Sequence, residues 1–117
     1  MLNRMVEYSP ASLDSVFGAM ADPTRRAILR RLARNPARVT DIAKSFPVSL
    51  NAVSKHLMVL ERSGLIRREI QGRDHICRLD ARPLREASAW MDEVRAFWEV
   101  RLDAFERHVI GKRSKRQ

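Results

Sequence analysis

Three things are scarce in this 117-residue chain: cysteine, acidic side chains relative to basic ones, and long apolar runs. The single cysteine, Cys77, excludes an internal disulfide framework and suits a reducing compartment. No apolar stretch approaches the roughly 20 residues that span a membrane, and Met1–Tyr8 lack the apolar run of a signal peptide. These absences favour a cytoplasmic protein, and the length favours one domain with a modest core.

The chain is strongly basic. Lys and Arg number 23 against 14 Asp and Glu, which gives a formal net charge of +9. Four of these cations lie in residues 111–117, which have nothing apolar to bury and are predicted to form a disordered basic tail. The rest, residues 1–110, is predicted to be a single folded domain that keeps an excess of positive charge. Such an excess indicates a polyanionic partner, and nucleic acid is favoured over acidic lipid.

Helical periodicity dominates the first part of the sequence. Apolar residues at steps of three and four predict an amphipathic helix over about residues 11–21. Asp22 can cap a second helix, and Pro23 fits its first turn. This second helix is expected to end at Asn35-Pro36.

Residues 40–63 have the pattern of a helix-turn-helix. Thr40 is expected to cap a short helix over residues 41–46, and Ser49 to cap a longer one over residues 50–63. A turn of about three residues separates the two helices, as in DNA-binding helix-turn-helix motifs.

Beyond Gly64, which is expected to stop that helix in a left-handed conformation, the period changes to that of β-strands. Two β-compatible runs flank Gln71-Gly72-Arg73, so residues 65–79 are predicted to form a β-hairpin with glycine at its turn. The inward face of the second strand is left open, because both Ile76 and the pair Cys77 and Leu79 are apolar.

Pro83 opens a long helix predicted to reach about Val109, roughly 40 Å at 1.5 Å per residue. Its apolar stripe, widened by Trp90 and Phe97, is too extensive for a core of about 70 residues. The first and last helices are therefore predicted to pair with a second copy across a two-fold axis, the alternative being an intrachain aromatic core. The predicted dimer interface consists of Leu13, Val16, Phe17, Met20, Met91, Val94, Trp98, Leu102 and Phe105.

The same features occur together in a known family. The stretches Phe17–Leu29 and Val53–Ile66, followed by the Gly72-Arg73 turn and an aromatic-rich last helix, resemble the ArsR-type (ArsR/SmtB) winged-helix repressors. The resemblance covers about residues 13–109. It implies a mainly α winged helix-turn-helix with a β-hairpin wing, in the order α-α-α-α-β-β-α. It also implies a dimer that represses a promoter by occupying an operator.

The helix over residues 50–63 is expected to place its N-terminal residues in the major groove of a palindromic operator. Asn51 can read adenine, Ser54 can contact bases or phosphate, and Lys55 can read guanine or only neutralise phosphate. The predicted DNA-binding residues are Ser49, Leu50, Asn51, Ser54, Lys55, Arg68 and Arg73.

Other basic residues have less defined roles. Arg73 at the wing tip would approach the minor groove or flanking phosphates, whereas Glu69 and Asp74 can pair with other wing arginines. Arg25 and Arg26 are expected to be surface charges or peripheral phosphate contacts. His56, within the recognition helix, is expected to pack near DNA.

Many members of the resembled family sense metals, and this sequence departs from that pattern. His75 and Cys77 share a strand face but lack an obvious third ligand of the kind that zinc requires. The last helix offers only His108, beside Asp103 and Glu106. No metal or other cofactor is expected, and the inducer is not indicated. Cys77 is expected to be inert rather than a redox switch, although the arginines around it would favour a reactive thiolate.

The leading prediction is thus a sequence-specific, homodimeric repressor. The alternative is a non-specific architectural DNA-binding protein, which the net charge and basic tail favour. An enzyme is not expected, because the sequence has no P-loop, no Gly-x-Ser-x-Gly elbow and no paired carboxylates facing a predicted cleft. A module that uses the winged helix for protein contacts is a further alternative. A repressor should prefer its operator over random DNA by ~10³-fold or more.

Overall fold

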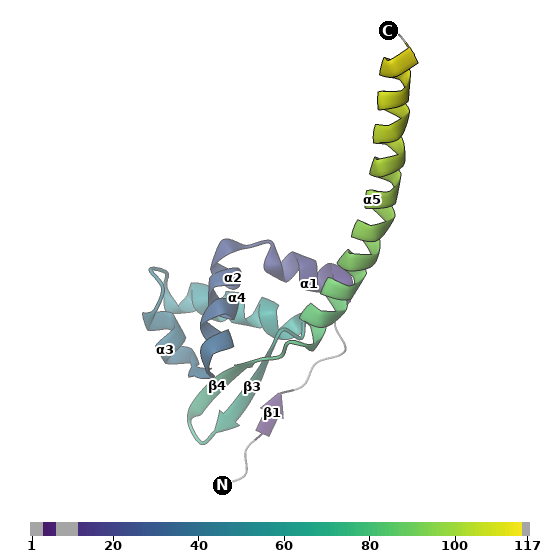
Figure 1. Cartoon of the computed structure of the whole chain (residues 1–117). Coiled ribbons are helices and arrows are strands. Elements are labelled where there is room, and N and C mark those ends of the chain that lie inside the picture. The colour runs from purple at the N-terminus through teal and green to yellow at the C-terminus, as the bar shows by residue number, and fades with distance from the viewer. Residues whose placement is uncertain (1–3, 7–11, 116–117) are drawn as a thin grey trace. The chain divides into compact units, whose positions relative to one another are not determined.

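The computed structural model describes the backbone of residues 4–6 and 12–115 and the side chains of residues 12–113. Two compact units divide the chain after Ala87: the first holds the sheet, four helices and the start of the last helix, and the second the rest of that helix. No helix in the described ranges is long and apolar enough to cross a membrane. The elements are β1 (Arg4–Val6), α1 (Leu13–Met20), α2 (Pro23–Arg34), β2 (Ala37–Arg38), α3 (Val39–Lys44), α4 (Leu50–Arg62), β3 (Ile66–Gln71), β4 (Asp74–Leu79) and α5 (Arg82–Lys115) (Figure 1).

Side-chain caps start two of the helices as the sequence predicts. The Asp22 carboxylate accepts a hydrogen bond from the Arg25 backbone N–H at 3.0 Å, which fixes the start of α2. The Ser49 hydroxyl accepts from the Ala52 N–H at 3.1 Å and starts α4. Each cap satisfies a backbone donor that has no partner inside its helix. The first helix, α1, is shorter than the predicted range 11–21. Residue 11 of that predicted range lies outside the described residues.

The start of α3 differs from the prediction. Thr40 lies inside the helix, so its predicted role as a cap is wrong. Ala37 and Arg38 pair with Cys77 and Ile76 of the hairpin, a strand that the sequence did not predict. This pairing holds Arg38 in an extended conformation, and the helix begins directly after it. The Arg38 guanidinium binds the Asp41 carboxylate at 3.0 Å in place of a side-chain cap.

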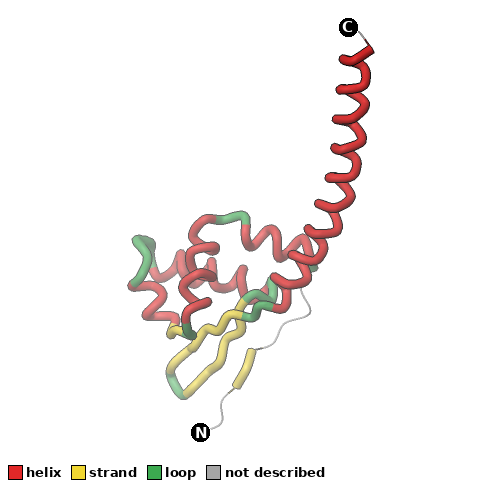
Figure 2. Tube along the Cα trace, viewed as in Figure 1, coloured by secondary structure: helices red, strands yellow, loops and turns green. Residues whose placement is uncertain are grey.

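The four strands form an antiparallel sheet in the order β1-β3-β4-β2, in which β3 and β4 form the predicted hairpin. Gln71 pairs with Asp74, so the turn consists of Gly72 and Arg73, and Gly72 has the positive φ of 62° that such a turn requires. The loop between α3 and α4 and the tip of the hairpin are green in Figure 2. Cys77 is completely buried and Ile76 is not, so the inward face carries Cys77 and Leu79.

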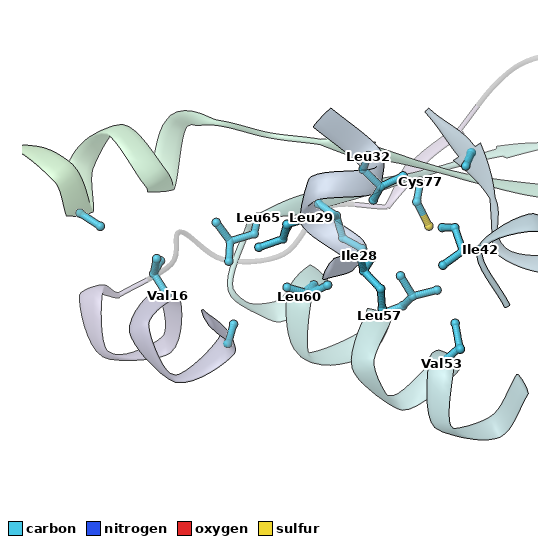
Figure 3. Packing of buried hydrophobic residues seen from close by; sticks show 14 residues of the cluster. Val16, Ile28, Leu29, Leu32, Ile42, Val53, Leu57, Leu60, Leu65 and Cys77 are labelled. Atoms are coloured by element: carbon cyan, nitrogen blue, oxygen red, sulfur yellow. The ribbon is translucent and has the colours of Figure 1, made fainter. Parts of the chain in front are cut away.

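The core of the first unit lies between the helices and the sheet (Figure 3). Val53, Leu57 and Leu60 of α4 are fully buried, as their spacing predicts. Val16 of α1 is only 2% exposed and belongs to this intrachain core, which leaves little of its side chain for a second copy; its place in a dimer interface stays a prediction. The four α1 residues predicted for the dimer interface thus differ in burial. Leu13, Phe17 and Met20 pack against the core but stay partly exposed.

The last helix, α5, runs on to Lys115. The helix therefore extends past the predicted end near Val109 and takes in residues 111–115 of the predicted basic tail. Lys and Arg have good helix propensity, and cations in the last turn interact favourably with the helix dipole, so a basic sequence can extend a helix without apolar contacts. Residues 116–117 of the predicted tail lie outside the described residues.

The second unit exposes many large apolar side chains of α5. They include Trp90, Met91, Phe97, Trp98, Val100, Leu102, Phe105 and Ile110. Within this set the Phe97 and Trp98 rings meet edge to face at 5.8 Å, and the Arg101 guanidinium lies 4.1 Å from the centre of the Phe97 ring. An apolar surface of this extent on one helix is typical of a binding face for another chain.

Candidate nucleic-acid interface

The exposed side of α4 carries the residues predicted to read DNA. Because Val53, Leu57 and Leu60 face the core, Leu50, Asn51 and Lys55 are exposed near the N-terminal end and Ser54 is half-buried. The Ser49 hydroxyl is engaged as the helix cap, the role that the sequence also favoured. The first two turns of the helix therefore present one short exposed surface that combines polar side chains with Leu50.

A cleft of about 390 Å³ separates this surface of α4 from the wing. Four of the seven predicted DNA-binding residues, Leu50, Ser54, Arg68 and Arg73, line it; Ser49, Asn51 and Lys55 do not. The remaining lining residues are Arg38, Val39, Thr40, Met58, Asp74 and His75. Recognition helix and wing tip thus border the same hollow.

Arg38 and Thr40 are lining residues that the sequence did not indicate. They reach the cleft because β2 joins the edge of the hairpin and α3 starts directly from it. Asp41 binds the Arg38 guanidinium, and this hydrogen bond raises the pKa of Arg38. Asp74 at the wing lies 4.0 Å from the same guanidinium. A two-residue strand has no periodic pattern, so only the pairing itself could have shown this position.

The four wing arginines fall into two groups. Arg67 pairs with Asp80 at 2.9 Å, Arg78 pairs with Glu69 at 2.9 Å, and Arg68 pairs with Glu61. Hydrogen bonds from Gln71 and Arg78 lower the pKa of Glu69, which keeps its carboxylate ionised. Arg73, at the turn, is exposed and forms no ion pair within the described part of the chain. It is the wing cation whose charge is available to an external anion.

Arg25 and Arg26 both contact the end of α1. The Arg25 guanidinium donates to the backbone oxygens of Ala19 at 2.6 Å and Gly18 at 3.1 Å, and that of Arg26 donates to Met20 O at 2.7 Å. Both side chains thereby satisfy carbonyls at the end of α1, and Arg26 remains exposed. They join α1 to α2 at the Asp22-Pro23 corner.

His56 of α4 contacts this same corner. Its Nδ1 lies 3.4 Å from Nη1 of Arg25 and 3.8 Å from the Asp22 carboxylate. His56 thus packs inside the protein against α2 as well as lying on the recognition helix. Sequence spacing could not show this contact, because the residues are about thirty positions apart.

Cys77 lies on β4, on the inward face of the wing. Burial raises the pKa of its thiol to about 11, and the opposing effect of the Arg68 charge is smaller. Burial therefore outweighs the arginines that the sequence suggested would activate it, and the thiolate needed for redox chemistry is disfavoured. Across residues 12–113, no group of three His, Cys, Asp or Glu side chains is placed to hold a metal ion.

A helix-turn-helix with an exposed second helix, followed by a β-hairpin that borders the same cleft, defines a winged helix-turn-helix protein. Comparison with known proteins agrees. A family model described as a helix-turn-helix domain matches residues 20–69. The HTH-type transcriptional regulator Rv2034 of Mycobacterium tuberculosis is 37% identical over 94 residues, which cover 80% of this chain and 85% of that protein. The transcriptional repressor SdpR of Bacillus subtilis is 33% identical over 79 residues, covering 68% and 88%.

Solved structures give the family. The crystal structure of the ArsR family transcriptional regulator RHA00566 matches with a TM-score of 0.70 and 45% identity, over 74% of this chain and 90% of that one. The homodimeric winged helix-turn-helix domain of Mb0332 from Mycobacterium bovis matches with a TM-score of 0.55 and 25% identity, over 78% of each chain. The chain belongs to the ArsR family of winged helix-turn-helix transcriptional regulators. The predicted fold, DNA-binding role and non-enzymatic class are confirmed.

Proposed function

We propose that this protein is a homodimeric repressor that binds a two-fold symmetric operator and acts in the cytoplasm without a cofactor. One observation carries this proposal: the exposed start of α4 and the unpaired Arg73 of the wing border a single cleft. In winged-helix proteins the recognition helix enters the major groove of DNA, while the wing reaches the neighbouring phosphate backbone. SdpR is named as a repressor and the Mb0332 domain as a homodimer, which supports both parts of the proposal.

On α4, the proposed contacts divide by chemistry. Asn51 reads a base edge through its amide, Ser54 contacts a base or a phosphate, and Lys55 supplies positive charge. Leu50 is 55% exposed and can pack against a thymine methyl group. Ser49 contributes through the cap that fixes the start of the helix.

The second copy is proposed to cover the apolar stripe of α5. Met91, Trp98, Leu102 and Phe105 are more than half exposed and lie at steps of three, four and seven along the helix, as a helix–helix seam requires. Val94 lies on the same stripe. Leu13, Phe17 and Met20 of α1 are proposed to contribute the parts of their side chains that the core leaves exposed.

The test is a selection of bound sequences from a random DNA pool with the purified protein at ~150 mM salt. Enrichment of a symmetric site with half-sites about one helical turn apart is expected. Salt-sensitive binding without enrichment would instead favour the architectural alternative. No binding at low salt would favour a protein-interaction module.

Two substitutions refine this test on the selected site. Asn51→Ala should weaken operator binding by ~1–3 kcal/mol and leave random DNA nearly unaffected, because an amide that reads a base adds nothing on other sequences. Arg73→Ala should weaken both and lower the salt slope by about one, as loss of a phosphate contact does. Arg67→Ala is the matched control, since Arg67 is held by Asp80 on the same hairpin. Equal losses from Asn51→Ala on both DNAs would exclude a base-reading role.

A further inference from the structure

A buried ion pair joins the last turn of α4 to the wing. The side chain of Glu61 is only 4% exposed, and its carboxylate accepts a hydrogen bond from the Arg68 guanidinium of β3. A buried carboxylate is costly unless a cation and hydrogen bonds compensate it. The pair therefore holds α4 and β3 at one separation, since moving them apart would take the Arg68 cation away from a buried carboxylate.

The direction of Arg68 follows from the sheet register. Arg68 lies opposite Cys77, which is fully buried, and two residues from the buried Ile66, so its side chain is on the face of the hairpin that covers α4. Its Nη1 also lies 3.4 Å from Nδ1 of His75, on the neighbouring strand. Arg68 borders the cleft while its guanidinium is directed at the protein.

The other wing ion pairs make no such connection. Arg67 and Arg78 face each other across the two strands on the opposite face of the hairpin, and their partners Asp80 and Glu69 belong to the wing or its end. Among the described residues, Glu61–Arg68 is thus the ion pair that links the wing to the recognition helix.

We propose that Glu61 and Arg68 are positioning residues for DNA recognition, and that Arg68 is not itself a phosphate contact. The inference rests on the proposed function. The pair sets the width of the cleft, so that Arg73 meets the backbone when Asn51 and Ser54 reach their bases. The contacts of α4 and of Arg73 increase the affinity together only when their spacing on the protein matches the spacing of their targets on DNA. A loosened wing would lose this increase in affinity although every contact residue is still present.

The experiment measures operator affinity and salt slope for Glu61→Gln, Arg68→Gln and the double variant, with the fold monitored by circular dichroism. Each single change should weaken operator binding by about tenfold with an unchanged salt slope, and the double variant should be no weaker than either single one. Binding to random duplex should change little. Arg78→Gln is the matched control: it breaks a wing ion pair that does not reach α4 and should leave operator affinity unchanged.

A phosphate-binding Arg68 gives the opposite pattern. Arg68→Gln would then lower the salt slope by about one, and Glu61→Gln would leave binding unchanged or strengthen it by removing a negative charge near DNA. Unaltered operator affinity in both single variants would equally overturn the proposal.

A second variant covers the case in which single changes unfold the protein. Replacing both residues by methionine, Glu61→Met with Arg68→Met, exchanges the ion pair for an apolar contact of similar volume, which buried pairs often tolerate. Retained operator affinity with the wild-type salt slope is expected, and a slope lowered by about one would overturn the proposal. If wild-type protein itself selects no site, the proposed repressor function fails, and this outcome is separate from the behaviour of the variants.

Discussion

At Cys77 two influences on the thiol pKa compete: burial on the inward face of the wing and the positive charge of Arg68. Burial dominates and raises the thiol pKa to about 11, against an ordinary value of 9.0. At pH 8 this leaves about a hundredfold less thiolate for reaction. A chromogenic disulfide reagent should therefore modify the native protein very slowly and the denatured protein completely. Rapid modification of the native protein, or a disulfide-linked dimer on a non-reducing gel, would contradict this.

Asp22 gives a prediction about acid stability. The hydrogen bond from the Arg25 N–H is the main cause that lowers the pKa of Asp22 below its ordinary value of 3.8, and the nearby His56 adds to it. A lowered folded-state pKa means that the ionised carboxylate stabilises the protein above pH 3.8, and that this contribution is lost as the pH falls through the folded-state pKa.

Asp22→Asn keeps an acceptor for the cap but removes the charge. Its free energy of unfolding should fall below that of the wild type near pH 6, and the two values should converge in acid. Asp22→Ala removes the acceptor too and should stay less stable at every pH. A gap between wild type and Asp22→Asn that does not narrow in acid would contradict the assignment.

At the scale of single elements, Gly64 ends α4 with a φ of 77°. A Cβ is disfavoured there, so Gly64→Ala should destabilise the protein by roughly 1 kcal/mol, measured by chemical denaturation. Gly64→Asn should cost less, because asparagine tolerates the left-handed region better than other non-glycine residues. The order Gly, Asn, Ala in decreasing stability is the expected result, and equal stability of all three would exclude a conformational role.

Sequence predicted the elements whose ends have local causes. Asp22, Ser49 and Gly64 act through bonds and angles within a few residues, so their patterns located α2 and α4 closely. The strands β1 and β2 depend on pairing with β3 and β4, far away in sequence, and two or three residues carry no period. The unforeseen β2 also explains the error at Thr40, because the strand determines where α3 begins.

In the candidate site, too, the sequence predicted what depends on local spacing and missed what depends on contacts between distant segments. The exposed face of α4 follows from the inward spacing of Val53, Leu57 and Leu60. The pairing of Arg68 with Glu61 requires knowing which face of the hairpin meets α4, and the sequence left that face open. The sequence predicted Arg68 and Arg73 as DNA ligands and allowed Glu69 and Asp74 to pair with other wing arginines, but nothing in its spacing indicated Glu61 as the partner of Arg68.

At the scale of the whole molecule, the apolar stripe of α5 predicts the oligomeric state. Trp98→Glu should raise the dimer dissociation constant by about 100-fold or more, because an unpaired carboxylate in an apolar interface is strongly unfavourable. Val100→Glu is the matched control: Val100 is 67% exposed against 55% for Trp98, but lies about 200° around the helix from it. Sedimentation velocity should show monomers for the first variant and dimers for the second. Equal effects of both would exclude the proposed seam.

The sheet has very short outer strands, β1 with three residues and β2 with two, on either side of a hairpin whose strands have six each. Unpaired strand edges are templates for adding another chain, and short outer strands limit this. The wing is thereby protected against fibrous self-association even where many copies gather. Removing the residues up to Val6 would uncover β3, and the expected consequence is a protein that precipitates through its wing while its helices remain folded.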